Sequence, residues 1–256
     1  MKIGFIGSGN MAAAMARGWA SAEDFDGSML FTDGGSGRAA ELAAQVKGEA
    51  VPDNGTLAAT ADLLVLAIKP AQLGTVAVGL TRPGKPVLSL LAATSLDTLE
   101  AALPGIPVLR VMPNLPVEVR RGVLCYACAE GVAGEIETQI RDLLSMLGEV
   151  ILLDDDLIDA ATAVMGCSPA YVAQLAETLT GAAVERGIDH QHARRMVNET
   201  IAGTAELLDS REALALRRDV ASPGGSTEKG LEALQRGGFT DALRSAVDAS
   251  LEKMGR

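Results

Sequence analysis

Short apolar runs alternate with helical patterns as far as residue 153. The runs are apolar at odd and even positions alike, as strands buried on both faces of a parallel sheet are. The alanine-rich segments between them, notably 12–20 and 38–46, repeat with helical spacing. This alternation predicts a doubly wound α/β domain. The predicted strands span 3–6, 29–32, 63–68, 87–91, 108–111, 122–129 and 148–153.

The pattern changes after residue 153, beyond which no strand is predicted. Three aspartates at 154–156 indicate the capped start of a helix. Pro169 should break or kink this helix, and Gly187 marks its end. The helical patterns span 155–187, 190–209, 212–220, 226–236 and 239–254. We therefore expect an α/β domain over residues 1–153 and an all-helical domain over residues 154–256.

A glycine motif follows the first predicted strand. Residues 7–12 read Gly-Ser-Gly-Asn-Met-Ala, which fits the G-x-G-x-x-G/A pattern of dinucleotide-binding folds. Gly7 permits the tight turn, Gly9 lets the backbone approach a pyrophosphate, and Ala12 allows a helix to pack closely on a strand. The N–H groups at the helix N-terminus then face the phosphates. These features predict a Rossmann-type dinucleotide-binding domain.

The end of the second predicted strand should select the cofactor. Asp33 lies about 20 residues past the motif, where a carboxylate would bind the ribose 2′-hydroxyl of NAD. The loop that follows carries Ser36 and Arg38, which could instead hold the 2′-phosphate of NADP. These residues leave both cofactors open, with a small preference for NADP.

Composition and charge exclude several classes of function. The 256 residues carry 22 basic and 33 acidic side chains, and the net charge of −11 argues against nucleic-acid binding. No apolar run approaches the ~18 residues that span a bilayer. Glycines interrupt residues 1–7 too early for a signal-peptide core, and three cysteines do not make a disulfide framework. We expect a cytoplasmic protein that binds no membrane, nucleic acid or metal ion.

The chain lacks the bases that other dinucleotide-dependent reductases use. Its two histidines, His190 and His192, flank a predicted helix start after Asp189 and are interpreted as surface residues. Residues 155–187 contain no lysine that could act as the base of a hydroxyacid dehydrogenase. Reduction of a C=N bond needs no strong side-chain base, because a protonated imine is already electrophilic and needs mainly to be positioned. The residues therefore favour imine reduction.

Five stretches resemble the Δ1-pyrroline-5-carboxylate reductase family, and the last two also keep its spacing and order. They are GFIGSGNM (4–11), AIKP (67–70), MPNLP (112–116), DLIDA (156–160) with GCSPAY (166–171), and ASPGGST (221–227). The resemblance covers nearly the whole chain. It implies a Rossmann-type domain, a helical dimerisation domain, and NAD(P)H-dependent reduction of L-Δ1-pyrroline-5-carboxylate to L-proline.

The resemblance assigns the substrate to the loop at 222–227. Free N–H groups at a helix N-terminus form an anion site, and Gly224 and Gly225 let a carboxylate come close. By the resemblance, this loop, with Ser222 and Ser226, binds the substrate carboxylate. Thr227 would be the catalytic residue, hydrogen-bonding the ring nitrogen as an orienter or proton relay.

The resemblance also implies where the cofactor binds. Asn54 corresponds to an asparagine near the adenosine, Lys69 and Pro70 line the nicotinamide-ribose side, and Asn114 lies near the nicotinamide. The expected cofactor is NADPH, with NADH as the alternative. The predicted cofactor-binding residues are Ile6, Gly7, Ser8, Gly9, Asn10, Met11, Asp33, Ser36, Arg38, Asn54, Ala67, Lys69, Pro70, Ala92 and Asn114.

The chain departs from the family pattern near the pocket. Met165 and Cys167 replace serines, Leu115 replaces threonine, and Ala93 replaces glycine. A different cyclic imine carboxylate therefore stays open as the substrate, and a regulatory protein that binds NAD(P) without turnover is a further alternative. The resemblance also implies a homodimer, or an assembly of dimers, in which the helical domain completes each active site.

Overall fold

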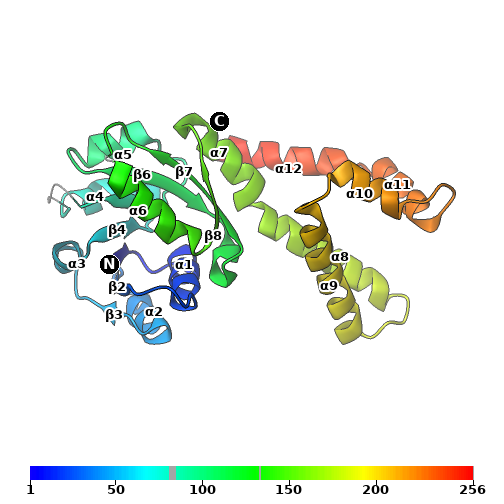
Figure 1. Ribbon diagram of the computed structural model, residues 1–256, viewed down its shortest axis with the longest axis horizontal. Coiled ribbons are helices and arrows are strands. Elements are labelled where there is room, and N and C mark those ends of the chain that lie inside the picture. Colours follow the sequence, from blue (N-terminus) through cyan, green and yellow to red (C-terminus); the bar gives the residue numbers. More distant parts are fainter. Residues whose placement is uncertain (81–84, 133, 256) are drawn as a thin grey trace. The chain divides into compact units, whose positions relative to one another are not determined.

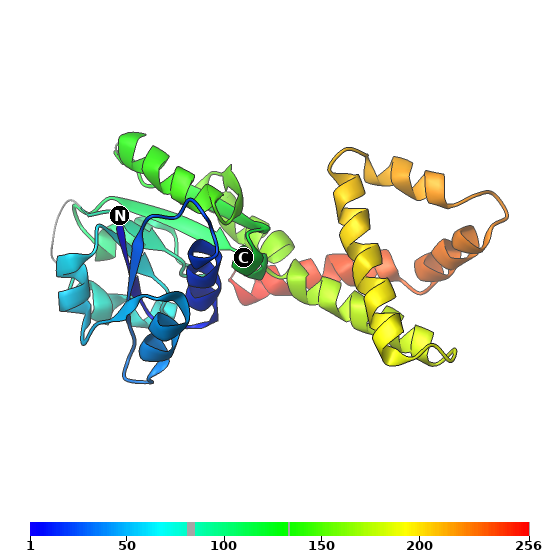
Figure 2. The same cartoon turned by 60° about the horizontal axis from the view of Figure 1, so that its bottom comes forward.

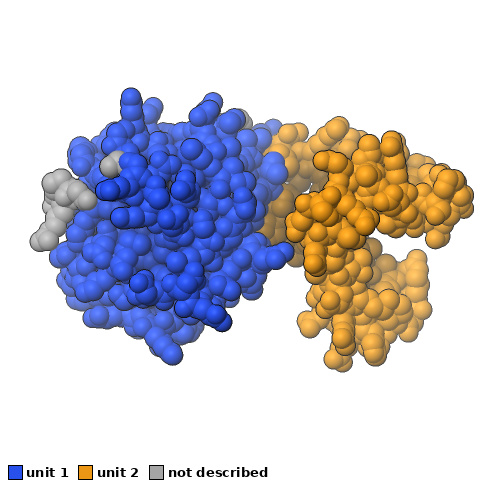
Figure 3. Space-filling view, viewed as in Figure 1, with its two compact units in different colours: residues 1–167, 251–256 blue, residues 168–250 orange. Residues whose placement is uncertain are grey.

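The computed structural model describes residues 1–80, 85–132 and 134–255. The chain forms two compact units, coloured separately in Figure 3. Unit 1 comprises residues 1–167 with 251–256, and unit 2 comprises residues 168–250. The domain boundary expected after residue 153 stays a prediction. Residues 81–84, 133 and 256 fall within the two expected domains and lie outside the described residues.

Unit 1 is built on an eight-stranded sheet of order β3-β2-β1-β4-β5-β6-β7-β8 (Figure 1). Pairing is parallel from β3 to β6, whereas β6 and β7 pair antiparallel. The expected α/β architecture is confirmed. The strands are β1 (Lys2–Ile6), β2 (Ser28–Thr32), β3 (Glu49–Ala50), β4 (Leu63–Leu66), β5 (Val87–Ser89), β6 (Val108–Pro113), β7 (Gly122–Cys128) and β8 (Gly148–Leu152).

Two of the predicted strands are each two residues too long at the carboxyl end. β4 ends at Leu66 rather than at residue 68, and β5 ends at Ser89 rather than at residue 91. The residues beyond both ends leave the sheet as loops. The structure also contains β3, which no apolar pattern marks because Glu49 and Ala50 are both exposed. The early ends matter because these loops lie at the candidate site.

Helices cover both faces of the sheet, and a separate hydrophobic cluster fills the space under each layer (Figure 1). Phe5, Trp19 and Phe31 pack in the first cluster, where the rings of Phe5 and Phe31 stack with centroids 5.2 Å apart. This cluster lies under α1 (Asn10–Ala20), α2 (Arg38–Val46) and α6 (Gly134–Ser145). The second lies under α3 (Asn54–Thr60), α4 (Leu73–Ala77), α5 (Leu96–Ala102) and α7 (Ile158–Ala161). Shorter turns are η1 (Pro70–Gln72) and η2 (Leu115–Val119).

The helix predicted over 155–187 is four elements rather than one. They are η3 (Asp155–Leu157), α7, the π-helical turn η4 (Thr162–Gly166) and α8 (Ser168–Val184). The break precedes Pro169, which lies in the first turn of α8, where a missing N–H costs nothing. The predicted aspartate cap is wrong: Asp154 forms no capping hydrogen bond with a described residue, and Asp155 bonds to Arg110 instead.

Unit 2 is all-helical, as predicted from the pattern. It contains α8, α9 (His190–Leu208), α10 (Ala213–Val220), α11 (Ser226–Arg236) and, as far as residue 250, α12 (Phe239–Lys253). α8 and α9 cross and pack on one another (Figures 1 and 2). His190 and His192 are exposed as expected, at the start of α9, and the Asp189 carboxylate caps that helix. Among the described residues of this unit, only Thr180, Ala193 and Leu216 are buried.

Candidate active site

The carboxyl ends of β1, β2, β4, β5 and β6 meet at one edge of the sheet, since these strands are parallel. The direction of the strand order reverses at β1, which lies between β2 and β4. Ligands of doubly wound sheets bind in the crevice at such a switch point. Apart from Asn54, which begins α3, the predicted cofactor residues lie at these ends: 6–11 at β1, 33–38 at β2, 67–70 at β4, 92 at β5 and 114 at β6.

Gly7 makes the turn that the glycine motif predicts. Its φ of +96° is unfavourable for residues with a side chain, and a Cβ there would lie 2.4 Å from the Ala67 carbonyl oxygen. The Gly7 N–H and the Ser8 hydroxyl both donate to the Thr32 carbonyl oxygen, each at 3.1 Å. The loop after β1 is therefore held against the ends of both β2 and β4.

Gly9 and the start of α1 form an open, positively polarised end of a helix. A Cβ on Gly9 would meet no atom within 4 Å, so that side of the loop is free for a ligand. Gly9 offers no side-chain cap, and the first amide bonded within the helix is that of Ala13, at 2.9 Å from the Gly9 carbonyl oxygen. The amides of residues 10–12 thus remain available to an anion such as a pyrophosphate.

Asp33 is engaged within its own loop. Its carboxylate accepts hydrogen bonds from the amides of Gly35 (2.7 Å), Ser36 (3.1 Å) and Ala39 (2.9 Å), and from the Ser36 hydroxyl (2.9 Å). These bonds, that of Ala39 foremost, hold the pKa of Asp33 below its usual value. By contrast, Arg38 is exposed and has no polar partner among the described residues. The loop thus presents a free guanidinium and a carboxylate that is already occupied.

Asn54 and Lys69 border the same edge. The Thr32 hydroxyl donates to the Asn54 side-chain oxygen at 2.7 Å, which fixes the amide at the start of α3 and leaves its NH₂ group to donate outwards. The Lys69 N–H donates to the Gln72 side chain at 3.1 Å, and Pro70 begins the η1 turn. The Lys69 ammonium is exposed and unpaired within the described part of the chain.

Ala93 adopts a left-handed backbone with φ of +51°. This position is the one at which the family pattern has glycine, which adopts that conformation without strain. The neighbouring Ala92 is exposed, and its carbonyl accepts a hydrogen bond from the Thr94 hydroxyl at 3.0 Å. The loop after β5 therefore holds an alanine in a backbone conformation that favours glycine.

Asn114 has both ends of its side-chain amide engaged inside unit 1. Its Oδ1 accepts from the Val123 N–H at 2.9 Å, and its Nδ2 donates to the Met165 carbonyl oxygen at 3.2 Å. The residue is buried at the end of β6. Its side chain therefore connects β6, β7 and the η4 turn through both atoms of the amide.

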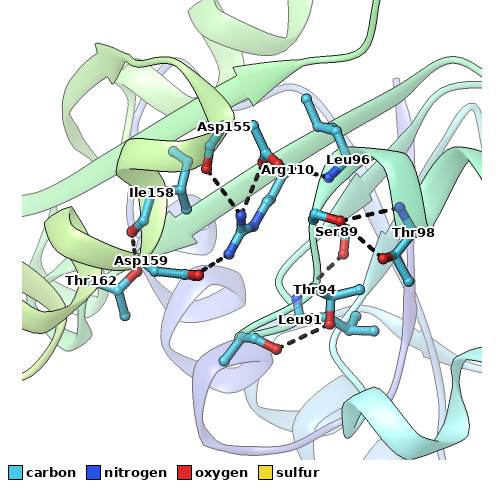
Figure 4. A network of polar contacts seen from close by, with 12 residues as sticks. Ser89, Leu91, Thr94, Leu96, Thr98, Arg110, Asp155, Ile158, Asp159 and Thr162 are labelled. Carbon is cyan, nitrogen blue, oxygen red and sulfur yellow. Dashed lines mark hydrogen bonds and ion pairs between the residues drawn. The ribbon is translucent and has the colours of Figure 1, made fainter. Parts of the chain in front are cut away.

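An ionic network that is buried except at Asp155 lies beneath this edge, and the sequence reading missed it (Figure 4). Arg110, on β6, donates through Nη1 to Asp155 Oδ1 at 3.0 Å and through Nη2 to Asp159. Asp155 Oδ2 accepts from the Leu96 N–H at 3.0 Å. The available signal was a lone arginine inside the apolar run 108–112, opposite aspartates that were interpreted as caps.

The substrate loop predicted at 222–227 lies in unit 2 and leads into α11. Gly224, at φ +75°, donates its N–H to the Glu228 carboxylate at 2.8 Å, and Gly225 donates to the Ser222 carbonyl at 2.9 Å. Both glycine amides are therefore bonded within the loop, which is compatible with the predicted role of the glycines in letting a carboxylate come close. The first amide bonded within α11 is that of Lys229, so the amides of residues 226–228 remain free.

Other chemistries find little support in the described residues. No group of three or more His, Cys, Asp or Glu side chains there is arranged to hold a metal ion. Burial raises the pKa of the Cys125 thiol, and raises that of Cys128 to about 11, so both stay protonated at neutral pH. Within the described ranges, no helix is both long and apolar enough to cross a lipid bilayer.

Family models match both parts of the chain. Residues 155–256 match the family described as pyrroline-5-carboxylate reductase dimerisation. Residues 2–93 match the family described as NADP oxidoreductase, coenzyme F420-dependent. The first match covers the helices of unit 2, and the second covers the sheet edge that carries the glycine motif.

Known proteins match the chain over its full length. The pyrroline-5-carboxylate reductase of Pseudomonas aeruginosa is 35% identical, with 98% of this chain and 95% of that protein aligned. That of Synechocystis is 32% identical, with 99% and 97% aligned. The crystal structure of the Streptococcus pyogenes enzyme superposes with a TM-score of 0.91 at 30% identity, over 99% of this chain and 98% of that chain.

A second solved structure carries a cofactor. Plasmodium falciparum pyrroline carboxylate reductase with NADP bound superposes with a TM-score of 0.89 at 27% identity, over 99% of this chain and 97% of that chain. Both the sequence and the fold of the chain thus match pyrroline-5-carboxylate reductases over almost its whole length. The chain belongs to the pyrroline-5-carboxylate reductase family.

Proposed function

We propose that the protein reduces L-Δ1-pyrroline-5-carboxylate to L-proline with NADPH. NADPH supplies a hydride from nicotinamide C4 to the imine carbon, and a proton on the ring nitrogen completes the secondary amine. The observation that carries the proposal is the pair of helix N-termini with free amides, at α1 and α11, in a chain that aligns throughout with this family. They match the two anions of this reaction, a pyrophosphate and a carboxylate.

The residues at the sheet edge fit a dinucleotide. The amides of residues 10–12 would hold the pyrophosphate above the open face of Gly9. The Asn54 NH₂ group would face the adenosine, and Lys69 the nicotinamide ribose. Asn114 would lie near the nicotinamide, in a position fixed by its bonds to Val123 and Met165.

NADPH is preferred over NADH in this proposal because of the loop after β2. A carboxylate that binds the ribose 2′-hydroxyl must have free lone pairs, and each oxygen of Asp33 already accepts two bonds from Gly35, Ser36 or Ala39. Arg38 is free to pair with a 2′-phosphate, and the Ser36 hydroxyl oxygen can still accept or be turned towards it.

The substrate carboxylate would bind at α11. The amides of Ser226 and Thr227 would donate to it, since those of Gly224 and Gly225 are bonded within the loop. The glycines then clear the approach, and Ser222 adds its hydroxyl. The Thr227 hydroxyl would face the ring nitrogen and hold or relay its proton. A carboxylate fixed in this way restrains the orientation of the pyrroline ring.

A homodimer in the cytoplasm completes the proposal. Unit 2 buries few side chains of its own, and its exposed apolar residues include Val172, Leu175 and Leu179 on α8. Apolar surface left this open on a helical unit marks an association surface. The dimerisation family that matches residues 155–256 supports a second copy of the chain as the partner.

Steady-state kinetics with the pyrroline substrate and either NADPH or NADH test the proposal. We expect turnover with both coenzymes and a higher kcat/KM with NADPH. A panel of other cyclic imine carboxylates distinguishes the alternative substrate suggested by Met165, Cys167 and Leu115. Tight NADPH binding without oxidation on any imine would contradict the proposal and favour a regulatory protein.

A further inference from the structure

Arg110 is a fully buried arginine in a strand that is otherwise apolar. It lies between Val108 and Met112 on the side of β6 that faces the second hydrophobic cluster. Its Nε has no hydrogen-bond partner among the described residues, so even its own hydrogen-bonding capacity is not fully used. A buried ion pair contributes little net stability, because desolvation offsets the attraction. Stability alone is therefore a poor reason for a guanidinium at this position.

The guanidinium joins three elements that are distant in sequence (Figure 4). Nη1 donates to the side chain of Asp155 at 3.0 Å and to its backbone carbonyl at 3.3 Å, and Nη2 pairs with Asp159. Asp155 also accepts the Leu96 N–H at the start of α5. The Arg110–Asp155 contact thus connects three elements, namely β6, α5 and the η3–α7 segment.

The same segment is tied to β6 a second time. Asn114, at the end of β6, donates to the Met165 carbonyl oxygen at 3.2 Å and accepts from Val123 at 2.9 Å. Residues 155–166 are thereby fixed at both ends to a single strand. The second attachment is at the sheet edge where the nicotinamide would lie, and the chain enters α8 directly afterwards.

We propose that Arg110 is a positioning residue for hydride transfer. Through Asp155 and Asp159 it fixes residues 155–166 against β6, and so fixes the η4 turn beside the nicotinamide end of the site. It touches neither cofactor nor substrate. This inference rests on the proposed function, because it concerns the geometry of that reaction.

The test asks whether Arg110 acts on kcat by positioning residues 155–166 or only by neutralising Asp155 and Asp159. Arg110→Met should lower kcat about 10- to 100-fold, as a displacement of about 1 Å at a reacting group does, and should change the NADPH Kd by less than about twofold. Arg110→Met alone leaves two carboxylates without their partner and should lower the thermal stability. Adding Asp155→Asn and Asp159→Asn removes those two charges, so the triple variant should regain thermal stability while its kcat stays low. Arg110→Lys, which retains one charged donor, should recover part of kcat.

Arg17→Met is the matched control, because Arg17 also pairs with a distant carboxylate, that of Glu118, but on the surface. It should leave kcat unchanged. The proposal is overturned if the triple variant regains kcat together with stability, or if the NADPH Kd of Arg110→Met rises as much as kcat falls.

Hydrogen exchange of the wild type and Arg110→Met adds a readout that needs no activity. The amides of residues 158–166 should exchange faster in the variant, while those of β6 and α5 stay protected. Unchanged protection of 158–166 would overturn the inference. A wild type that fails to reduce the pyrroline substrate would instead overturn the proposed function, and exchange would still decide whether Arg110 fixes this segment.

Discussion

Thr227 lies in the first turn of α11, and its hydroxyl has no hydrogen bond to another described residue. Thr227→Ala should lower kcat/KM about 10- to 100-fold, which corresponds to about 1.4–2.7 kcal/mol of lost transition-state stabilisation. Thr227→Ser keeps the hydroxyl and should retain most of the activity. Steady-state kinetics check this, and equal losses in both variants would exclude the proposed role of the hydroxyl.

Arg38 should determine the choice of cofactor. Arg38→Ala removes the free cation beside the proposed 2′-phosphate, so the KM for NADPH should rise about tenfold and that for NADH should stay nearly constant. Lys47→Ala, at the other end of α2, is the control and should change neither KM. Equal increases for both coenzymes would place the 2′-phosphate elsewhere.

At the scale of elements, α1 uses two glycines for different purposes. A Cβ on Gly18 would lie 2.2 Å from the Val117 carbonyl oxygen and 2.6 Å from Leu147, whereas one on Gly9 would meet nothing. Gly18 therefore lets the helix pack on η2, and Gly9 leaves space for a ligand. Substitution of Gly18 should therefore affect mainly the stability of unit 1, and substitution of Gly9 mainly the binding of NADPH.

Gly18→Ala should destabilise unit 1 by about 1–3 kcal/mol, because the clash involves backbone. Gly9→Ala should cost at most about 1 kcal/mol, as a poorer N-cap, but should weaken NADPH binding about tenfold by filling the approach to the pyrophosphate. Fluorescence of Trp19, the only tryptophan, measures unfolding of unit 1. A Gly9 variant that binds NADPH normally would show that the pyrophosphate lies elsewhere.

The loop after β5 carries a backbone strain that a substitution should relieve. Ala93 has φ of +51°, so Ala93→Gly should stabilise unit 1 by about 0.5–1 kcal/mol. Ala92→Gly is the control: its backbone is not left-handed, so glycine there should lower stability slightly. Denaturant unfolding followed by Trp19 fluorescence tests both, and a lower midpoint for Ala93→Gly would contradict the prediction.

At the scale of the whole molecule, the small number of buried side chains in unit 2 predicts that this unit associates with a second copy of the chain. Val172 lines an apolar groove between α8 and α9 and is 44% exposed, so Val172→Asp should leave the isolated chain folded but split the dimer. Val119→Asp replaces a residue that is 69% exposed in unit 1 and is the control. Sedimentation velocity reports the outcome, and a monomeric wild type would contradict the proposed dimer.

The fold could be predicted from the sequence because its signals are local. The apolar runs mark seven of the strands, and the glycine motif places a phosphate-binding turn after the first. β3 was missed because its two residues are exposed and it depends only on pairing with Leu30 and Phe31. The ends of β4 and β5 were misplaced because apolar residues continue past the last paired residue into loops that are partly buried.

The candidate site was predictable to the extent that it consists of short motifs. The motifs at 7–12 and 222–227 each include the start of a helix, and local sequence determines which amides a helix N-terminus leaves free. Which of those amides are already bonded depends on the folded path of each loop, which the motif alone does not specify. The carboxylate of Glu228 takes the Gly224 N–H, and Asp33 folds its own loop instead of facing a ribose.

The sequence by itself thus determined the α/β and helical halves, the cofactor motif and the family resemblance, because spacing along the chain encodes turns, periodicity and helix ends. Only the tertiary structure decided the partners of Arg110, Asn114 and Asp155. Their contacts join residues that are far apart in the chain, and no spacing rule specifies which buried charges meet. The tertiary structure likewise revealed how little core unit 2 has, since burial is a property of packing.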